Sequence, residues 1–381
     1  MQTKKTILLF IDWYLPGYKA GGPIQSCANL VEHLKNEYRF LIVTRDTDYC
    51  ETQPYSNVRS NEWNIIDENV HIYYFSATKL SKKNIHSLIN KTKFDAVYLN
   101  GIFSFSFTII PLLYFRKNKG HKVILAARGM LAKGALAIKS KKKQLFLNFA
   151  KLLGLFKNII FHATSEAERI DIINTLGKKN QIKIAGNLSK NITLKSFERK
   201  SKQTGLVKLI NVARIAPEKN LKFALEILKE VKSNVQFDFY GPVYDESYYN
   251  DCKHIIAKMP SQVKVTYKGV LPNSEVNSKL QKYDAMLMPT LGENFGHIIL
   301  ESLLASCPVI ISDQTPWKNL ESTYAGWSIP LKNKQKFIEA IEFLAQCDEE
   351  DFNIYTLAAY QKSKDFIENK ELINSNIALF E

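Results

Sequence analysis

The sequence lacks the features that would place it in several large classes of protein. Its 381 residues include five cysteines, an odd number, and none of them forms a Cys-x-x-Cys pair. This argues against a disulfide framework and a zinc site, and it favours reduced thiols in a reducing compartment. No run of about twenty apolar residues is present, so no segment is a candidate membrane-spanning helix. The apolar run Ile7–Ile11 stops at Asp12, which predicts a buried strand rather than a signal peptide.

Several catalytic motifs are also missing. The sequence has no P-loop and no Gly-x-Gly-x-x-Gly, which argues against a kinase and a dinucleotide-dependent oxidoreductase. No Gly-x-Ser-x-Gly motif or Cys/His pairing supports nucleophilic catalysis. The seven histidines show no metal-ligand spacing. Residues that carry chemistry should therefore lie in the loops that follow the predicted strands.

Negative charge is missing from a long part of the first half. No Asp or Glu occurs between Ala96 and Ser165, although this stretch holds twelve Lys and Arg residues and the chain has a net charge of +15. Such a surface suits a phosphorylated ligand, an anionic membrane or nucleic acid, and it is also compatible with a solvated basic surface. No nucleic-acid recognition motif is present, so we expect no nucleic-acid partner. The basic run Lys139–Lys143 precedes the predicted apolar helix Leu145–Phe156 and would suit an anionic membrane, with a solvated loop as the alternative.

Strands alternate with helices in two successive series. The first series opens with the strand Thr6–Ile11, a loop, the helix Pro23–Asn36 and the strand Phe40–Thr44, which is the order of a parallel βαβ unit. A second series begins at the strand Lys208–Ala213, after a polar stretch rich in charge. This pattern predicts an α/β protein of two Rossmann-like doubly wound domains that face each other across a cleft. The predicted parts are an N-terminal acceptor-binding domain (1–195), a C-terminal nucleotide-sugar-binding domain (203–362) and a C-terminal helix that packs back on the N-terminal domain (363–381).

The segment Met288–Glu301 is the most informative one. It leaves a predicted strand, turns through Gly292 and Gly296, and enters an apolar helix. The free backbone N–H groups at the start of a helix attract phosphate. Glu293 falls in the loop and Glu301 falls in the helix, so two carboxylates suited to sugar hydroxyls flank this phosphate-binding position. Two unrelated surface glutamates are the alternative.

Two cations follow the first strand of the second series. Arg214 stands at the end of this strand, and Lys219 stands five residues later, where the next helix begins. Because ligands of such sheets bind at the carboxyl ends of the strands, both cations should reach the same crevice as the glutamate segment. Preorganised cations stabilise the charge that develops on a departing nucleoside diphosphate.

Taken in order, these features resemble those of the retaining glycosyltransferases of family 4, which have the two-domain B-type glycosyltransferase fold. The resemblance covers nearly the whole chain. It rests on the Gly21-Gly22 loop, the Arg-x4-Lys pair, the Glu-x7-Glu segment and a helical tail. Two further stretches, Ala127–Leu131 and His162–Glu168, are similar to family members that build bacterial surface polysaccharides.

The resemblance implies roles for the matched residues. Arg214 and Lys219 would bind the donor diphosphate, Glu301 would hold the ribose hydroxyls, and Glu293 would contact the donor sugar as a catalytic residue. The other donor-binding candidates are Gly22, Asn294, Phe295, Gly296 and His297. The candidates for contact with the base are Val270 and Leu271. The acceptor-side candidates are Gly21, Arg128 and Lys133.

Three positions carry alternatives to these roles. Many family members have a histidine near the reacting sugar in the first domain, whereas the corresponding strand end here reads Ala127-Arg128-Gly129. Arg128 would then be a catalytic residue that stabilises phosphate or sugar oxygens, and a buried structural arginine is the alternative. We expect His162 to be a structural hydrogen-bonding group. The pattern Asp46-Thr47-Asp48 matches a metal-binding motif of the other major glycosyltransferase fold, but we predict a capped turn there.

On this resemblance we expect a metal-independent retaining hexosyltransferase without a cofactor. It would move a sugar from a nucleotide-diphosphate donor to a glycan, in particular a lipid-linked oligosaccharide of bacterial lipopolysaccharide or capsule synthesis. Such a protein would be cytoplasmic and peripheral on the inner face of the plasma membrane. The alternatives are a nucleotide-sugar epimerase of the same fold and a non-catalytic, membrane-associated protein that binds nucleotide sugars.

Overall fold

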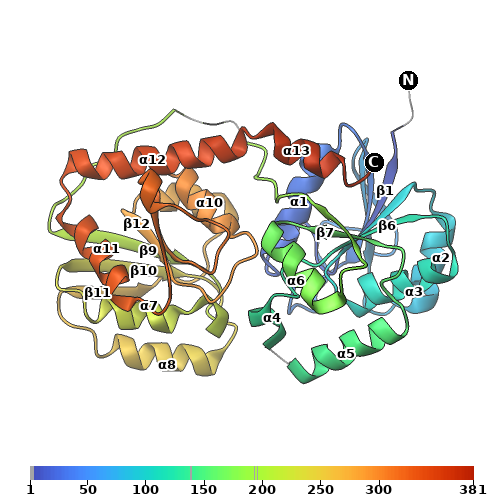
Figure 1. Cartoon of the computed structure of the whole chain (residues 1–381), viewed down its shortest axis with the longest axis horizontal. Coiled ribbons are helices and arrows are strands. Elements are labelled where there is room, and N and C mark those ends of the chain that lie inside the picture. The colour runs from blue at the N-terminus through green and yellow to red at the C-terminus, as the bar shows by residue number, and fades with distance from the viewer. Residues whose placement is uncertain (1–3, 138–139, 193, 195) are drawn as a thin grey trace. The chain divides into compact units, whose positions relative to one another are not determined.

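The chain divides into two compact units in the computed structural model (Figure 1). The structure describes residues 4–137, 140–192, 194 and 196–381, without the side chains of Lys133, Ala137 and Ser140. Unit 1 comprises Met1–Ile192 and Asn369–Glu381, and unit 2 comprises Thr193–Glu368. Unit 1 is thus built from two separate parts of the sequence. Within the described residues, no helix is both long enough and apolar enough to cross a membrane.

Unit 1 contains one sheet with the strand order β3-β4-β2-β1-β5-β6-β7-β8 in its described part. Neighbouring strands are parallel except β3, which pairs antiparallel with β4 at the edge. The strands are β1 (Thr6–Phe10), β2 (Arg39–Arg45), β3 (Trp63–Asp67), β4 (Val70–Phe75), β5 (Ala96–Asn100), β6 (Lys122–Ala126), β7 (Ile160–Ala163) and β8 (Gln181–Ile184). The helices are α1 (Gly22–Leu34), α2 (Lys82–Lys91), the π-helix η1 (Phe105–Ile109), α3 (Ile110–Lys117), α4 (Lys133–Ala137), α5 (Ser140–Leu152), α6 (Glu166–Leu176) and α13 (Lys370–Ile377).

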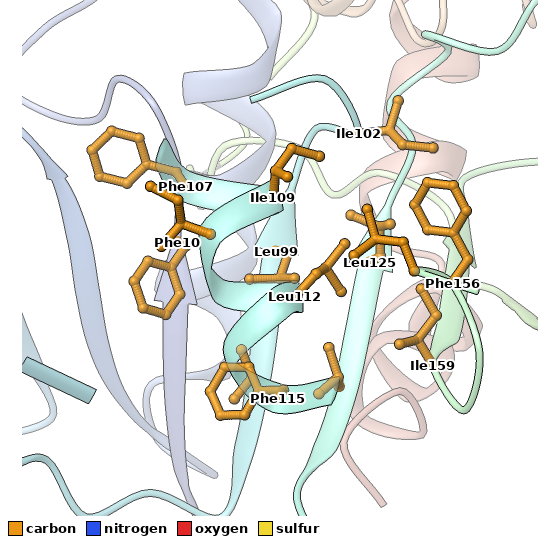
Figure 2. Close-up of a cluster of buried hydrophobic side chains, with 14 of the residues drawn as sticks. Phe10, Leu99, Ile102, Phe107, Ile109, Leu112, Phe115, Leu125, Phe156 and Ile159 are labelled. Atoms are coloured by element: carbon orange, nitrogen blue, oxygen red, sulfur yellow. The ribbon is translucent and has the colours of Figure 1, made fainter. Parts of the chain in front are cut away.

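Helices cover both faces of this sheet, and the apolar runs of its strands follow from that. In β1, Ile7 and Leu9 pack with α1, whereas Leu8 and Phe10 belong to the core on the other face. Figure 2 shows this second core, in which Phe107 and Ile109 of η1 lie near Phe10. Successive side chains of a strand point to opposite faces, so a strand that is buried on both faces must be apolar throughout.

The last residues of the chain return to unit 1. The ring of Phe380 lies 5.3 Å from that of Tyr38 and 6.2 Å from that of Phe40, measured between ring centroids. The side-chain amide of Asn376 donates to the carbonyl of Gly186 at 2.8 Å. Helix α13 and the residues after it therefore form part of the core next to α1.

Unit 2 contains a parallel sheet with the order β11-β10-β9-β12-β13-β14. Its strands are β9 (Leu206–Val212), β10 (Asn234–Tyr240), β11 (Val263–Tyr267), β12 (Ala285–Met288), β13 (Val309–Ser312) and β14 (Gly326–Ile329). Its helices are η2 (Pro217–Lys219), α7 (Leu221–Leu228), α8 (Glu246–Ile256), η3 (Asn273–Glu275), α9 (Val276–Leu280), α10 (His297–Leu304), η4 (Glu321–Thr323), α11 (Lys334–Gln346) and α12 (Glu349–Ile367).

The strand order of unit 2 fixes where a ligand can bind. Strands β10 and β11 extend the sheet on one side of β9, and β12, β13 and β14 extend it on the other. The loops after β9 and β12 consequently leave the sheet in opposite directions, and in open α/β sheets the crevice between two such loops is the usual ligand site. Both units have the predicted doubly wound α/β architecture.

Candidate functional site

The loops after β9 and β12 are joined by an ion pair between two of the predicted site residues. The ammonium group of Lys219, at the end of η2, pairs with the carboxylate of Glu293 in the loop after β12. Their side chains are only 17% and 14% exposed. The two residues are 74 positions apart in sequence. The structure therefore brings a cation and an acid together at the point where the strand order reverses.

Hydrogen bonds between the two loops hold this ion pair in place. The side-chain amide of Asn220 donates to the carbonyl of Pro289 at 2.9 Å. The backbone N–H of Leu291 and the hydroxyl of Thr290 both donate to the carbonyl of Glu218, at 2.9 Å and 3.0 Å. Thr290 is fully buried. The backbone on either side of Lys219 is thus fixed to the loop that carries its partner.

A glycine sets the entry into helix α10. Gly296 precedes the helix with φ 77°, and a Cβ atom there would lie 2.7 Å from Cδ1 of Ile299. Phe295 belongs to the core, since its ring packs on those of Trp317 and Phe366 and its carbonyl accepts the indole N–H of Trp317 at 2.7 Å. Because its side chain is buried, only the backbone of Phe295 could contact a donor.

The remaining residues of the motif are half-buried. Arg214 has one guanidinium nitrogen 3.3 Å from Glu218, and its guanidinium carbon lies 5.2 Å from the centroid of the Tyr244 ring. Its orientation is therefore defined. Glu301 lies in the second turn of α10, and Asn294 and His297 lie on either side of the Phe295-Gly296 turn.

The candidates for contact with the base lie at the same edge of the sheet. Val270, which is 51% exposed, and Leu271, which is partly buried, follow β11. The backbone N–H of Gly241, after β10, donates to the carbonyl of Gly269 at 2.9 Å. The loops after β10 and β11 are thereby joined, with β10 between Val270 and the strand that leads to Arg214.

In unit 1, the glycine loop is held by the second aspartate of the Asp-x-Asp pattern. Gly21 has φ 75° and precedes α1, whose first residue is Gly22. The carboxylate of Asp48 accepts the backbone N–H groups of Tyr18 at 3.0 Å and Lys19 at 3.2 Å. The pattern predicted as a capped turn therefore organises the loop that leads to the two glycines.

Arg128 lies inside unit 1, with its guanidinium hydrogen-bonded on three sides. Arg128 is 9% exposed, and its backbone has φ 54°. The guanidinium donates to Asn100 Oδ1 at 2.7 Å, to Asn187 Oδ1 at 2.8 Å and to the Tyr98 hydroxyl at 2.8 Å. These contacts connect the ends of β5 and β6 with the segment after β8. They favour the structural alternative for Arg128. The other acceptor-side candidate, Lys133, begins α4, and its side chain lies outside the described part of the structure.

His162 is the buried neighbour of Arg128 and gives a prediction about pH. Burial, and secondarily the charge of Arg128, lower the pKa of His162 from 6.5 to about 3. Between these values the unfolded chain binds a proton that the folded chain does not, so the free energy of unfolding falls as the pH drops from about 6.5 towards 3. At pH 5 this group alone should cost unit 1 about 2 kcal/mol relative to pH 7. Urea titrations of His162→Asn should show a flatter pH dependence, and equal dependence in both proteins would contradict the prediction.

Unit 1 also contains a group of polar residues that the sequence analysis does not predict as a site. Asp12 lies two residues after the end of β1, and its carboxylate lies 3.5 Å from a guanidinium nitrogen of Arg45, at the end of β2. The carbon of this guanidinium lies 5.6 Å from the Trp13 ring centroid, and its buried Nε has no hydrogen-bond partner in the described structure. Burial raises the pKa of Asp12, although hydrogen bonds from Ser104 and Arg45 oppose the effect. Since β1 lies between β2 and β5, the strand order reverses here too, as it does at β9 in unit 2. The position of Asp12 after the first strand is the sequence feature that could have predicted a site residue here.

Comparison with known proteins finds a similarity in the unit that holds the Lys219–Glu293 pair. Residues 192–362 match the family model described as glycosyl transferases group 1. Unit 2 is thus the part of the chain that is similar to this family. The matched region runs from the start of unit 2 to near the end of α12, so it includes both loops that meet at the ion pair.

Two bacterial relatives are similar to this chain at low sequence identity. An uncharacterized 41.2 kDa protein of the cps region of Klebsiella pneumoniae is 23% identical over 260 residues, which is 66% of this chain and 69% of that protein. The Salmonella typhimurium protein WcaL, a candidate glycosyltransferase of colanic acid biosynthesis, is 22% identical over 180 residues, 45% of this chain and 44% of WcaL.

Solved structures extend the likeness to both units. HepE from Anabaena, solved in complex with UDP and glucose, superposes with a TM-score of 0.72 and covers 98% of each chain at 13% sequence identity. At this identity the likeness shows the fold alone. It confirms the predicted B-type glycosyltransferase fold.

Proposed function

We propose that the protein is a retaining glycosyltransferase that moves a hexose from a nucleoside-diphosphate donor to a glycan acceptor. The observation that carries this proposal is the ion pair between Lys219 and Glu293, because it places a cation and an acid where the strand order of unit 2 reverses. A ligand that needs both charges is a nucleotide sugar, whose diphosphate is anionic and whose hydroxyls bind carboxylates. HepE was solved with UDP and glucose, which agrees with this class of ligand.

The charges of the site explain how the donor would be bound and activated. In the ion pair, the ammonium of Lys219 and the carboxylate of Glu293 neutralise each other. A diphosphate offers the ammonium a stronger negative partner, which leaves the carboxylate to accept hydrogen bonds from the sugar. Arg214 would bind further phosphate oxygens through its planar guanidinium, and Glu301 would accept hydrogen bonds from the ribose. Donor binding and the placing of Glu293 against the sugar are coupled in this scheme.

The transfer itself would keep the configuration of the anomeric carbon. The bond between this carbon and the β-phosphate oxygen breaks, and the acceptor oxygen bonds to the same face of the sugar. The proton of the acceptor hydroxyl passes to the departing phosphate. Cations fixed beside that phosphate stabilise its growing charge in the transition state, which is the largest contribution that Lys219 and Arg214 could make.

Nucleoside diphosphates give a direct test of the donor site. We expect UDP or GDP, at about a hundred times its Kd and with EDTA present, to raise the melting temperature of unit 2 by about 5–10 °C. The matching monophosphates, which lack the β-phosphate, should give much smaller shifts. If no nucleoside diphosphate shifts the melting temperature, the donor site is wrongly assigned. A shift that appears only with a divalent metal would contradict the metal-independent mechanism.

The acceptor belongs to unit 1 in this proposal. The relatives from the cps region and from colanic acid biosynthesis favour a growing surface polysaccharide, and a lipid-linked oligosaccharide is the form in which such an acceptor would be offered on the cytoplasmic face of the membrane. Within unit 1, the loop with Gly21 and the Asp12–Arg45 group lie at the carboxyl ends of neighbouring strands. An acceptor hydroxyl could donate to the Asp12 carboxylate there.

A further inference from the structure

Helix α5 of unit 1 and the residue after it carry four large apolar side chains that are exposed. Leu145, Phe149 and Leu152 are 59%, 55% and 82% exposed, and Leu153, directly after the helix, is 51% exposed. Leu145, Phe149 and Leu152 are spaced by four and three residues, which places them on one side of the helix, and Leu153 follows at its end. We call these four residues the α5 stripe.

The α5 stripe is separate from the face that attaches the helix to unit 1. Leu147 is fully buried and Ala150 is 2% exposed, and both belong to the core against the sheet. The ring of Phe146 lies 5.6 Å from that of Phe103. The helix is therefore docked through its own apolar face, and the stripe is additional apolar surface. Contiguous exposed apolar surface on a folded unit is a sign of an interaction site.

Exposed lysines surround the stripe. Lys141 and Lys142 lie one turn before Leu145, on the side of the helix that holds the stripe, and Lys151 and Lys157 lie farther along. None of these four cations makes an ion pair with any residue that the structure describes. Lys143, by contrast, is turned inward, where its ammonium donates to the carbonyl of Ala135. No acidic residue occurs anywhere from Ala96 to Ser165, so the positive charge around the stripe is not offset locally.

We propose that the α5 stripe inserts into the surface of an anionic lipid bilayer, with the flanking lysines on the lipid headgroups. Apolar side chains on one face and lysines beside them are the composition of helices that lie in the membrane interface. Charge decides against a second copy of the chain as the occupant, since a symmetric dimer through this face would bring the same lysines against each other. This partner goes beyond the donor chemistry of unit 2 and does not depend on it.

Vesicle binding of the full chain tests this surface. We expect the protein to co-sediment with vesicles of phosphatidylcholine and phosphatidylglycerol at low salt and to bind vesicles of pure phosphatidylcholine at least about tenfold more weakly. The variant Leu145→Ser/Phe149→Ser/Leu152→Ser should lose at least about tenfold in binding to the anionic vesicles, as should Lys141→Glu/Lys142→Glu.

Matched variants elsewhere on unit 1 test whether vesicle binding depends on the α5 stripe or on the overall charge and apolar surface of the unit. Ile65 and Ile66 of β3 are 70% and 60% exposed, so Ile65→Ser/Ile66→Ser removes equally exposed apolar groups elsewhere. Lys82→Glu/Lys83→Glu reverses two exposed charges on α2. Both control variants should bind anionic vesicles within about twofold of the unchanged protein.

Two outcomes would overturn the proposal. One is equal vesicle binding by the serine variant and the unchanged protein, and the other is a dimer in light scattering that the serine variant converts to a monomer. All α5 variants should keep the melting shift given by nucleoside diphosphates, because the donor residues lie in unit 2. If the unchanged protein shows the melting shift but does not bind anionic vesicles, this surface is wrongly assigned and the proposed function stands. If it binds the vesicles but shows no melting shift, the proposed function is wrong and this surface stands.

Discussion

Replacing Lys219 with alanine should lower kcat/KM for sugar transfer by about 100- to 1,000-fold, the range for loss of one preorganised group that stabilises developing negative charge. The ammonium is held beside Glu293 by hydrogen bonds between two loops, so it is already placed before the phosphate departs. Steady-state kinetics with a radiolabelled donor measure the effect. Most of the loss should appear in kcat, since the charge on the phosphate grows in the transition state.

The partner residue allows catalysis to be separated from folding. Lys219→Ala leaves the carboxylate of Glu293 partly buried without its cation, which lowers stability as well as activity. The double variant Lys219→Ala/Glu293→Gln removes both charges, so it should recover most of the melting temperature and none of the activity. Lys222→Ala is the matched control, because this exposed lysine lies three residues away and pairs with Asp251 on the surface. Activity within tenfold of the unchanged protein for the double variant would refute the assignment of the site.

Gly241→Ala should destabilise unit 2 by at least about 3 kcal/mol. A Cβ atom at this position would lie 1.9 Å from the carbonyl oxygen of Ala213, and the residue has φ 142°, which side chains rarely allow. The conflicting atom belongs to the backbone and cannot rotate away. Ala213 precedes Arg214, so the backbone shift that relieves the overlap would also displace this candidate donor residue.

Urea-induced unfolding of unit 2, with and without UDP or GDP, checks both consequences. Gly292→Ala serves as the control, because a Cβ atom there meets nothing within 4 Å and the backbone is not in the left-handed region. The control should unfold within about 1 kcal/mol of the unchanged protein. If Gly241→Ala were as stable as Gly292→Ala, the close approach of the loops after β9 and β10 would be misplaced.

The buried parallel strands and the helices between them could be predicted, because strands that are buried on both faces are apolar runs in the sequence. Strand β2 contains the whole predicted strand Phe40–Thr44, because Phe40–Val43 is a buried apolar run, and helix α1 begins one residue before the predicted Pro23. Strand β3 could not be predicted. It is an edge strand with Ile65 and Ile66 both exposed, so it shows neither alternation nor burial. Strand β14 could not be predicted either, because it has only four residues and begins at a glycine.

The sequence predicts which loops form the candidate site, but it does not predict which of their residues are in contact. Arg214, Lys219 and Glu293 could be grouped because all three follow strands of one sheet, whose carboxyl ends lie at one edge. The pairing of Lys219 with Glu293 depends on hydrogen bonds to the backbone carbonyls of Glu218 and Pro289, and these have no sequence signature. The same limit applies to Arg128, whose three acceptors come from separate parts of the chain.

The return of the last helix to unit 1 has a consequence for synthesis on the ribosome. The ring of Phe380 fills the core beside Tyr38 and Phe40, residues made more than three hundred positions earlier. Unit 2 is continuous in sequence up to Glu368, whereas the larger part of unit 1 lacks this side chain until residues 369–381 are made. Unit 1 therefore cannot complete its core before unit 2 has been synthesised, unlike an N-terminal domain that is continuous in sequence and can fold first.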